Sequence, residues 1–267
     1  MDQTQPSNTG TYIYCVARAQ PFERDSSPFA TPGIGGQEQV RILTYDDLAA
    51  VVSDSPQDQY DISRENLLAH QRVLIQALTR SDVLPVSFGT VAASDQEVQE
   101  KLLEREADDL HRSLEHVRGR IELDLKVLWN EERLFSEIVA ENEDIRALRD
   151  RLAGQAPDAT HYERIQLGER VAAALERKSA AEAAALLDAL EPLAVETRVN
   201  KNLGDMMLLN AAFLVDRSQE QAFDTRVQSL GEAQAGRLIF QYVGPLPPYN
   251  FVDIELQWEE EPDGSAD

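Results

Sequence analysis

Strict alternation of apolar and polar side chains over residues 121–129 constrains the fold more than any other feature of the sequence. This segment reads IELDLKVLW, so every odd-numbered side chain from Ile121 to Trp129 is apolar and charged side chains stand between the first four of them. Successive side chains of a strand point to opposite faces of a sheet, so the pattern predicts a half-exposed antiparallel strand. The face of that sheet that carries the apolar side chains must be covered by further elements.

Three apolar segments before this strand are also predicted to be strands. They lie at residues 11–17, 40–54 and 83–92. The second reads as two short strands around a turn at Asp46–Asp47, and the third is broken by Pro85 and Gly89.

Two helices are predicted between these strands. The first begins at Ser63 and carries Leu67, His70 and Leu74 at helical spacing. The second begins at a capping box, Ser94 followed three residues later by Glu97, and ends at Gly119. We therefore expect residues 11–129 to form an α+β domain with two helices over one face of an antiparallel sheet.

Residues 130–190 differ in character, because charged helical patterns replace the strands. A joint at Gly154–Thr160 contains Gly, Pro and Asp, which predicts an antiparallel helical hairpin. The second helix is rich in alanine between Val171 and Ala189. Such small side chains give a thin apolar seam, so this helix is a candidate for contact with a partner.

A second α+β domain is predicted for residues 191–258. Strand patterns lie at 195–199, 237–243 and 252–258, and a helix at 220–234. The continuously apolar segment 206–215 fits a central strand, although a buried helix is an alternative. This order is compatible with a split βαβ or ferredoxin-like arrangement. Residues 1–10 are expected to be a disordered extension and residues 259–267 an acidic tail.

The charge of the chain disfavours several kinds of partner. With 48 acidic and 25 basic residues the net charge is −23, which repels nucleic acid and anionic lipid. A single cysteine excludes an intrachain disulfide, and no apolar run approaches the ~20 residues of a spanning helix. Without a signal peptide pattern either, we expect a soluble intracellular protein.

Signals for catalysis are weak. The four histidines show no metal-ligand spacing, and His70 lies on the apolar stripe of its helix. Cys15 reads as a buried thiol, and Ser87 lacks the preceding glycine of a nucleophile elbow. The glycine-rich stretch 33–36 precedes a strand and not the helix that a phosphate site needs. We therefore predict no catalytic residue, cofactor or metal, and no enzymatic activity.

The proline-rich stretch GPLPPYNFV at residues 244–252 admits two interpretations. Pro245 and Pro248 match a polyproline-ligand pattern. The stretch nevertheless follows an apolar strand and contains Tyr249 and Phe251, which favours a rigid crossover that ends the sheet. We interpret it as architecture first, and its use as a binding edge remains open.

Seven segments, taken in order, resemble the gas vesicle protein F/L family. They are TYIYCVA at 11–17, DLAAVVSD at 47–54, LLAHQRVL at 67–74, VLPVSFGTV at 83–91, GRIELDLKV at 119–127, LLNAAFLVDR at 208–217, and LIFQYV with GPLPPYNFV at 238–252. The resemblance covers residues 11–252 and does not distinguish the F from the L subtype. It implies two α+β domains and a helical hairpin, without catalytic or cofactor residues.

The resemblance also implies a function and partners. Family members are expected to assist nucleation and assembly of the gas vesicle shell by binding the major shell protein and preventing its aggregation. The major shell protein and other minor gas vesicle proteins are then the partners, without nucleic acid or membrane. The expected location is the gas vesicle, with a cytoplasmic state before assembly.

Three segments are candidates for the partner surface. Their residues are Pro85, Phe88 and Gly89; Val171, Leu175 and Leu186; and Pro245, Pro247, Pro248, Tyr249 and Phe251. An alternative function is a general protein-interaction scaffold in which the hairpin is the docking arm. An enzyme with an unrecognised site is a third possibility, and a polar cleft without an apolar surface patch would favour it.

Overall fold

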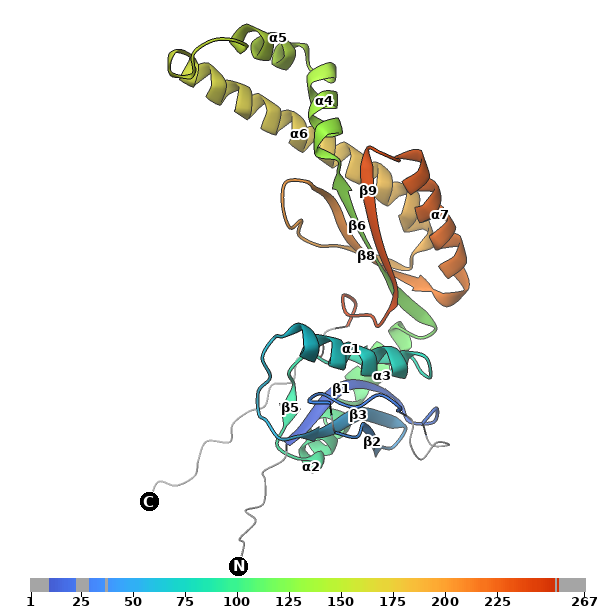
Figure 1. Ribbon diagram of the computed structural model, residues 1–267. Helices are drawn as coiled ribbons and strands as arrows, with labels where there is room; N and C mark the ends of the chain where they lie inside the picture. Colours follow the sequence, from blue (N-terminus) through green and yellow to red (C-terminus); the bar gives the residue numbers. More distant parts are fainter. Residues whose placement is uncertain (1–9, 23–28, 37, 253, 255–267) are drawn as a thin grey trace, which may run out of the picture. The chain divides into compact units, whose positions relative to one another are not determined.

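The computed structural model describes residues 10–22, 29–36, 38–252 and 254 (Figure 1). They fall into two compact units. Unit 1 is formed by Met1–Glu122 together with Pro245–Asp267, and unit 2 by Leu123–Gly244. Both units combine an antiparallel pairing of strands with packed helices, which confirms the α+β class.

Unit 1 contains a five-stranded sheet. Its strands are β1 (Gly10–Arg18), β2 (Arg41–Tyr45), β3 (Leu48–Ser55), β4 (Val83–Pro85) and β5 (Val91–Ala92). The order is β2-β3-β1-β4, with β5 also paired to β1, and each of these pairings is antiparallel. The hairpin between β2 and β3 turns at Asp46, whose φ of 49° lies in the left-handed region, as the sequence predicted.

A β-bulge in the central strand β1 decides which side chains face which layer. The register with β3 shifts between Ile13 and Cys15, so an extra residue interrupts the usual alternation. As a result Tyr12, Tyr14 and Cys15 share one apolar cluster, whereas Ile13 and Val16 belong to another. All of these side chains are fully buried, so the sheet must be covered on both faces.

Helices on opposite faces of the sheet provide this cover. The cluster around Tyr12 includes Val73 and Leu74 of α1 (Arg64–Leu78). The other cluster includes side chains of η1 (Val98–Glu104), which is π-helical, and of α3 (Ala107–His116). The expectation of two helices over one face is therefore wrong, because β1 buries both of its faces. The second helix is also interrupted, since α2 (Asp95–Glu97), η1 and α3 replace one continuous helix.

Unit 2 contains a four-stranded sheet in the order β7-β8-β6-β9. The strands are β6 (Arg120–Trp129), β7 (Glu196–Val199), β8 (Met207–Asp216) and β9 (Leu238–Leu246). Counted along the chain, the second strand of this unit is followed across the sheet by the third, the first and the fourth. This is the ferredoxin-like arrangement. Segment 206–215 is thus a central strand and not a buried helix. The 121–129 strand was expected in the first domain, but it pairs within this second sheet.

Contacts with helices explain why β6 belongs to unit 2. Trp129 donates its indole N–H to Ser179 Oγ of α6 (His161–Leu190) at 3.2 Å. On the neighbouring strand β8, Phe213 packs against Phe223 of α7 (Glu220–Ala233), with ring centroids 5.0 Å apart. α6 also contacts α7 and β8. The apolar side of β6 therefore finds its cover in this layer.

The helical hairpin is part of unit 2. Its first arm consists of α4 (Glu131–Glu141) and α5 (Glu143–Leu152), which pack against α6. We expected one helix in this arm, but Asn142 adopts extended backbone angles between the two. The turn η2 (Pro157–Thr160) leads into α6, and short 3-10 segments, η3 (Glu191–Leu193) and η4 (Arg217–Gln219), follow α6 and β8.

Parts of the sequence-based expectation fall on residues that are not described. These include the terminal segments 1–9 and 255–267, so nearly all of the predicted extension, the acidic tail and most of the strand at 252–258 lie outside the described residues. Gly10, which was expected in the extension, is buried and begins β1. Val252 and Ile254 are described and do not belong to a strand.

Arg237 joins the base of the hairpin to the sheet of unit 2. Its guanidinium bonds Glu137 of α4 at 2.8 Å and also pairs with Glu182 of α6. It lies over the ring of Trp129, 5.2 Å from the centroid, which adds a cation–π contact. Lys178 bonds the same Glu137 at 3.1 Å. These side chains are at most about a quarter exposed, so the network should contribute more than a surface ion pair.

We expect Arg237→Ala to lower the free energy of unfolding by about 2–3 kcal/mol, because two partly buried carboxylates lose a charged donor. Urea denaturation measures this loss. Arg133→Ala, an exposed position on α4, is the matched control and should change stability by less than about 0.5 kcal/mol. Equal effects of the two variants would contradict the role of the network.

Candidate partner-binding site

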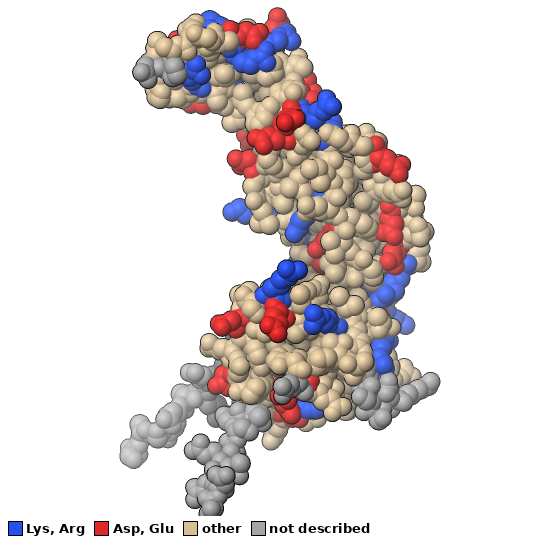
Figure 2. All heavy atoms as spheres, viewed as in Figure 1, with Lys and Arg blue, Asp and Glu red and all other residues tan. Residues whose placement is uncertain are grey.

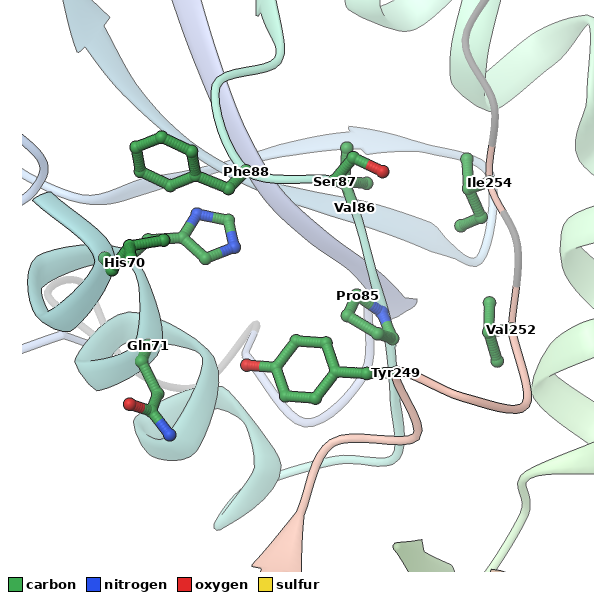
Figure 3. Close-up of a pocket in the computed structure, with 10 residues that line it drawn as sticks. His70, Gln71, Pro85, Val86, Ser87, Phe88, Tyr249, Val252 and Ile254 are labelled. Atoms are coloured by element: carbon green, nitrogen blue, oxygen red, sulfur yellow. The ribbon is translucent and has the colours of Figure 1, made fainter. Parts of the chain in front are cut away.

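A hollow with a volume of about 380 Å³ opens on unit 1 (Figure 3). Three walls enclose it. Leu67, His70 and Gln71 of α1 form the first wall, residues 85–88 the second, and Tyr249, Val252 and Ile254 the third. Seven of the ten lining residues are apolar or aromatic, but polar and apolar atoms contribute nearly equal parts of the exposed lining, and His70, Gln71 and Ser87 supply polar side chains.

The second wall exists because the sequence stops β4 at a proline. Pro85 has no N–H to donate to the ladder, and β4 ends there. Val86 N–H still donates to the Tyr14 carbonyl at 2.9 Å, and the chain turns at Phe88 and Gly89. Thr90 closes this turn, since its backbone N–H and its hydroxyl both donate to the Ser87 carbonyl, at 3.3 and 2.7 Å. Gly89 has a φ of 86°, which favours glycine. Phe88 is thereby placed edge-on against His70, with ring centroids 5.8 Å apart.

The proline-rich stretch forms the third wall. Its backbone folds into a tight turn, in which Tyr249 N–H donates to the Pro247 carbonyl at 2.7 Å and Phe251 N–H to the Pro248 carbonyl at 3.1 Å. Pro247, Pro248 and Phe251 are buried. The stretch is thus structural, as we interpreted it, but the expected rigid, extended crossover is wrong, because β9 continues through Pro245 to Leu246 and a tight turn follows. The turn leaves Tyr249 39% exposed at the hollow.

A buried carboxylate fixes this turn. Glu122 is 1% exposed and accepts two hydrogen bonds from Asn250, from the backbone N–H at 2.7 Å and from the side-chain amide at 2.8 Å. The sequence pattern placed Glu122 on the solvent face of its strand. That expectation is wrong, because the turn covers this end of β6.

His70 and Cys15 are buried in the core of unit 1. Tyr12 hydroxyl bonds His70 Nδ1 at 2.9 Å, and Gly89 N–H donates to the same hydroxyl at 3.0 Å. Burial lowers the pKa of His70 to about 4, so the ring is neutral near pH 7. Burial also raises the pKa of the Cys15 thiol, which keeps it protonated. Among the described residues, no group of three or more His, Cys, Asp or Glu is placed to hold a metal ion. The hollow therefore presents a neutral imidazole and uncharged polar groups beside its apolar side chains.

The structure brings together part of the predicted partner surface. Pro85 and Phe88 meet Tyr249 around the hollow, although their segments are far apart in the sequence. Gly89 shapes the wall through its backbone, and Pro245 is exposed outside it.

The predicted residues of α6 lie in unit 2. Leu186 is 4% exposed and belongs to the packed core, whereas Val171 and Leu175 are half-buried. Leu175 lines a separate hollow of about 470 Å³, together with Ser179 and Met207.

Sequence reasoning missed the solvent side of α1. Leu67, Leu68 and Ile75 are 43%, 37% and 41% exposed. The stripe that contains Leu67 was assigned to the core, but His70, Val73, Leu74 and Ala77 fill that role. Leu68 and Ile75 are seven residues apart and thus lie two helical turns apart on one side. This second apolar stripe was the available signal.

We expect Asn250→Ala to lower the free energy of unfolding by about 1–2 kcal/mol, because the buried carboxylate of Glu122 loses the side-chain amide donor and keeps only the backbone N–H of residue 250. Asn202→Ala, at an exposed position of unit 2, is the control and should have a much smaller effect. Chemical denaturation compares the two variants. A loss no larger than that of the control would show that the turn is held by other contacts.

The depressed pKa of His70 predicts a pH dependence. Because the unfolded chain binds this proton more tightly, the stability contribution of the neutral ring is complete above pH ~6.5 and is lost as the pH falls toward 4. We expect the unfolding free energy of the wild type to fall by about 2–3 kcal/mol more than that of His70→Gln between pH 7 and 4. His161→Gln, at an exposed position, should retain the wild-type slope. Parallel pH profiles for all three proteins would refute this role.

Comparison with known proteins shows what the chain is similar to. The model of the family described as "Gas vesicle synthesis protein GvpL/GvpF" matches residues 10–253. Gas vesicle protein F of Streptomyces sp. (strain CB03234) is 37% identical over 246 residues, which cover 91% of this chain and 99% of that protein. Gas vesicle protein L2 of Halobacterium salinarum is 25% identical over 260 residues, which cover 91% of each chain.

A solved structure agrees with these sequence matches. The crystal structure of the gas vesicle protein GvpF from Anabaena sp. PCC7120 superposes with a TM-score of 0.80 at 26% identity, over 93% of this chain and 100% of that one. The match of the family model over nearly the whole described chain, together with the 37% identical relative, shows that the chain belongs to the gas vesicle synthesis protein GvpL/GvpF family.

Proposed function

We propose that this gas vesicle protein is a non-enzymatic assembly factor that binds the major shell protein through the hollow of unit 1 and the apolar side of α1. We call these two features together the α1 surface, consisting of Leu67, Leu68, Ile75, Phe88 and Tyr249. The observation that carries the proposal is the exposure of four of these large apolar side chains on one unit, at 37–43% each. Membership in the family supports a gas-vesicle-associated role, and the α1 surface supplies the contact that such a role requires.

The dimensions and chemistry of the hollow support the binding of an apolar side chain. Its volume of about 380 Å³ falls in the range of ~300–1,000 Å³ of ordinary ligand pockets. Pro85 and Phe88 offer rigid apolar walls, and Tyr249 contributes an aromatic ring of the kind enriched at interface hot spots. Gln71 and Ser87 can orient a backbone amide of the bound segment.

The charge of the chain supports a role in keeping an apolar partner in solution. Its net charge is −23, and a net charge far from zero opposes aggregation of the protein and of its complexes. Figure 2 shows charged side chains distributed over both units, with uncharged areas between them. We propose that shell protein bound at the α1 surface is shielded from other shell subunits until it is added to the wall.

The proposed location is the gas vesicle, with a cytoplasmic state before assembly. In the described part of the chain, no helix has both the length and the hydrophobicity that crossing a membrane requires. The proposed partners are the shell protein and other minor gas vesicle proteins, which extends what the names of the relatives say.

We expect Leu67→Asp and Leu68→Asp each to weaken binding of co-expressed shell protein by at least about tenfold, since an unpaired charge would be buried in an apolar contact. A pull-down of tagged full-length protein with quantified shell protein measures the loss. Val243→Asp, which places the same charge at a 55% exposed position of β9, is the matched control and should bind normally.

Leu175→Asp separates this proposal from docking through the hairpin. If it abolishes binding while Leu67→Asp and Leu68→Asp do not, α6 is the contact and the α1 surface is not. If none of the three variants loses shell protein that the wild type retains, both surfaces are excluded. Wild-type protein that retains no shell protein but binds another minor vesicle protein would contradict the proposed partner.

A further inference from the structure

We propose that β7 pairs with β7 of a second copy of this chain, so that the two unit 2 sheets join across a twofold axis at Thr197. This inference concerns self-association and does not depend on the proposed shell binding. It rests on the position of β7 in the sheet, on the exposure of its side chains and on the self-complementary sequence of residues 195–199, Val-Glu-Thr-Arg-Val.

The position of β7 leaves one of its sides open within the described residues. It is the first strand in the order β7-β8-β6-β9 and therefore an edge strand. Asn200 N–H donates to the Asn210 carbonyl of β8 at 2.7 Å. By alternation, the backbone groups of Thr197 and Val199 then point away from β8. An edge strand with outward-pointing backbone groups is a template for a further strand.

The sequence of β7 is complementary to itself in antiparallel pairing. With the axis at Thr197, Glu196 of each copy lies opposite Arg198 of the other. On the other face of the strand, the two Thr197 side chains are adjacent and Val199 lies near Val195, which precedes β7 and donates its own N–H to the Leu214 carbonyl of β8 at 2.7 Å. The backbone donors left for the second copy are therefore those of Thr197 and Val199. Opposite charges, valine pairs and threonine pairs are all favourable cross-strand neighbours.

Other registers are disfavoured by the same side chains. An axis at Glu196 places two carboxylates opposite each other, and an axis at Arg198 places two guanidinium groups opposite each other. Like charges directly across a strand pair are destabilising. A slip by one residue would exchange the faces of the strand. The chemistry of the segment therefore selects the axis at Thr197.

The exposure of these side chains matches what the pairing would use. Val199 of β7 is 60% exposed, which is unusual for valine in a sheet, and Val195, just before the strand, is 45% exposed. Glu196 and Arg198 bond each other within one chain at 3.2 Å, with 35% and 52% of their side chains exposed. In the dimer the same two groups can each bond the opposite copy as well. Leu203, 76% exposed, flanks the edge in the loop after β7.

The opposite edge of the sheet lacks these properties. β9 ends in Gly244, Pro245 and Leu246, and proline cannot complete a ladder. The short length of β7 implies a small interface, and small interfaces give weak, concentration-dependent association. We therefore expect a closed dimer in equilibrium with monomer, and no extended polymer.

Sedimentation velocity of the full chain over a concentration series tests the proposal through a charge exchange. Arg198→Glu places Glu196 opposite a glutamate, and Glu196→Arg places Arg198 opposite an arginine, so each single variant should dimerise at least tenfold more weakly than the wild type. The double variant Glu196→Arg, Arg198→Glu restores opposite charges in both pairs and should dimerise like the wild type. Asp188→Arg, an exposed change on α6, controls for the change in net charge.

An equimolar mixture of the two single variants provides a second arm. One copy then carries two arginines and the other two glutamates at these positions, so the mixture should form heterodimers although each variant alone dimerises at least tenfold more weakly than the wild type. Wild-type protein that remains monomeric at its highest soluble concentration would overturn the proposal. A double variant that fails to recover dimerisation, or assemblies larger than a dimer, would overturn it as well.

Crosslinking locates the axis. Directly opposed residues of a hydrogen-bonded antiparallel pair have Cα atoms ~5.5 Å apart, within the ~4.4–6.8 Å that a disulfide requires. Thr197→Cys should therefore form a disulfide-linked dimer on mild oxidation, while the native Cys15 is fully buried. Val199→Cys faces Val195 of the other copy and should crosslink much more slowly. Equal crosslinking at both positions would contradict an axis at Thr197.

Discussion

The buried carboxylate of Glu122 is the contact on which the candidate site depends. It accepts both available donors of Asn250, and so holds the proline-rich turn against unit 1. Because the turn is held there, Tyr249 closes the hollow opposite α1 and Phe251 enters the core. A carboxylate in this environment is costly to bury without donors, so the turn and the strand end stabilise each other.

The two units use the same strand order with different connections. Across the sheet, the strands of unit 1 lie in the order β2-β3-β1-β4 and those of unit 2 in the order β7-β8-β6-β9. In both sheets the second strand along the chain is followed by the third, the first and the fourth, so the arrangement is the same. In unit 2 the first connection is the whole hairpin with α6, whereas in unit 1 the chain from Arg18 to Arg41 contains no helix in its described residues. The hairpin is thus an enlarged connection of a ferredoxin-like unit, and this gives α6 a role in the core through Leu186.

Local chemistry made much of the fold predictable from the sequence. Ser63 and Ser94 mark helix starts as expected, because each hydroxyl accepts a hydrogen bond from a backbone N–H of the first turn. The bulge in β1 could not be anticipated, because it depends on its pairing with β3, and it moves Cys15 to the face of Tyr12. Because the bulge could not be anticipated, the cover of helices on both faces of the unit 1 sheet was also missed. The candidate site was half predictable: proline and glycine marked its turns, but the meeting of residues 85–88 with Tyr249 depends on the long-range pair Glu122–Asn250.

The most direct measurement of the central claim is hydrogen–deuterium exchange of the full chain, alone and in complex with co-expressed shell protein. If the α1 surface carries the contact, backbone protection should increase in peptides from residues 64–78, 85–92 and 247–252, while peptides of α6 remain unchanged. Protection confined to α6, or none in unit 1, would contradict the account.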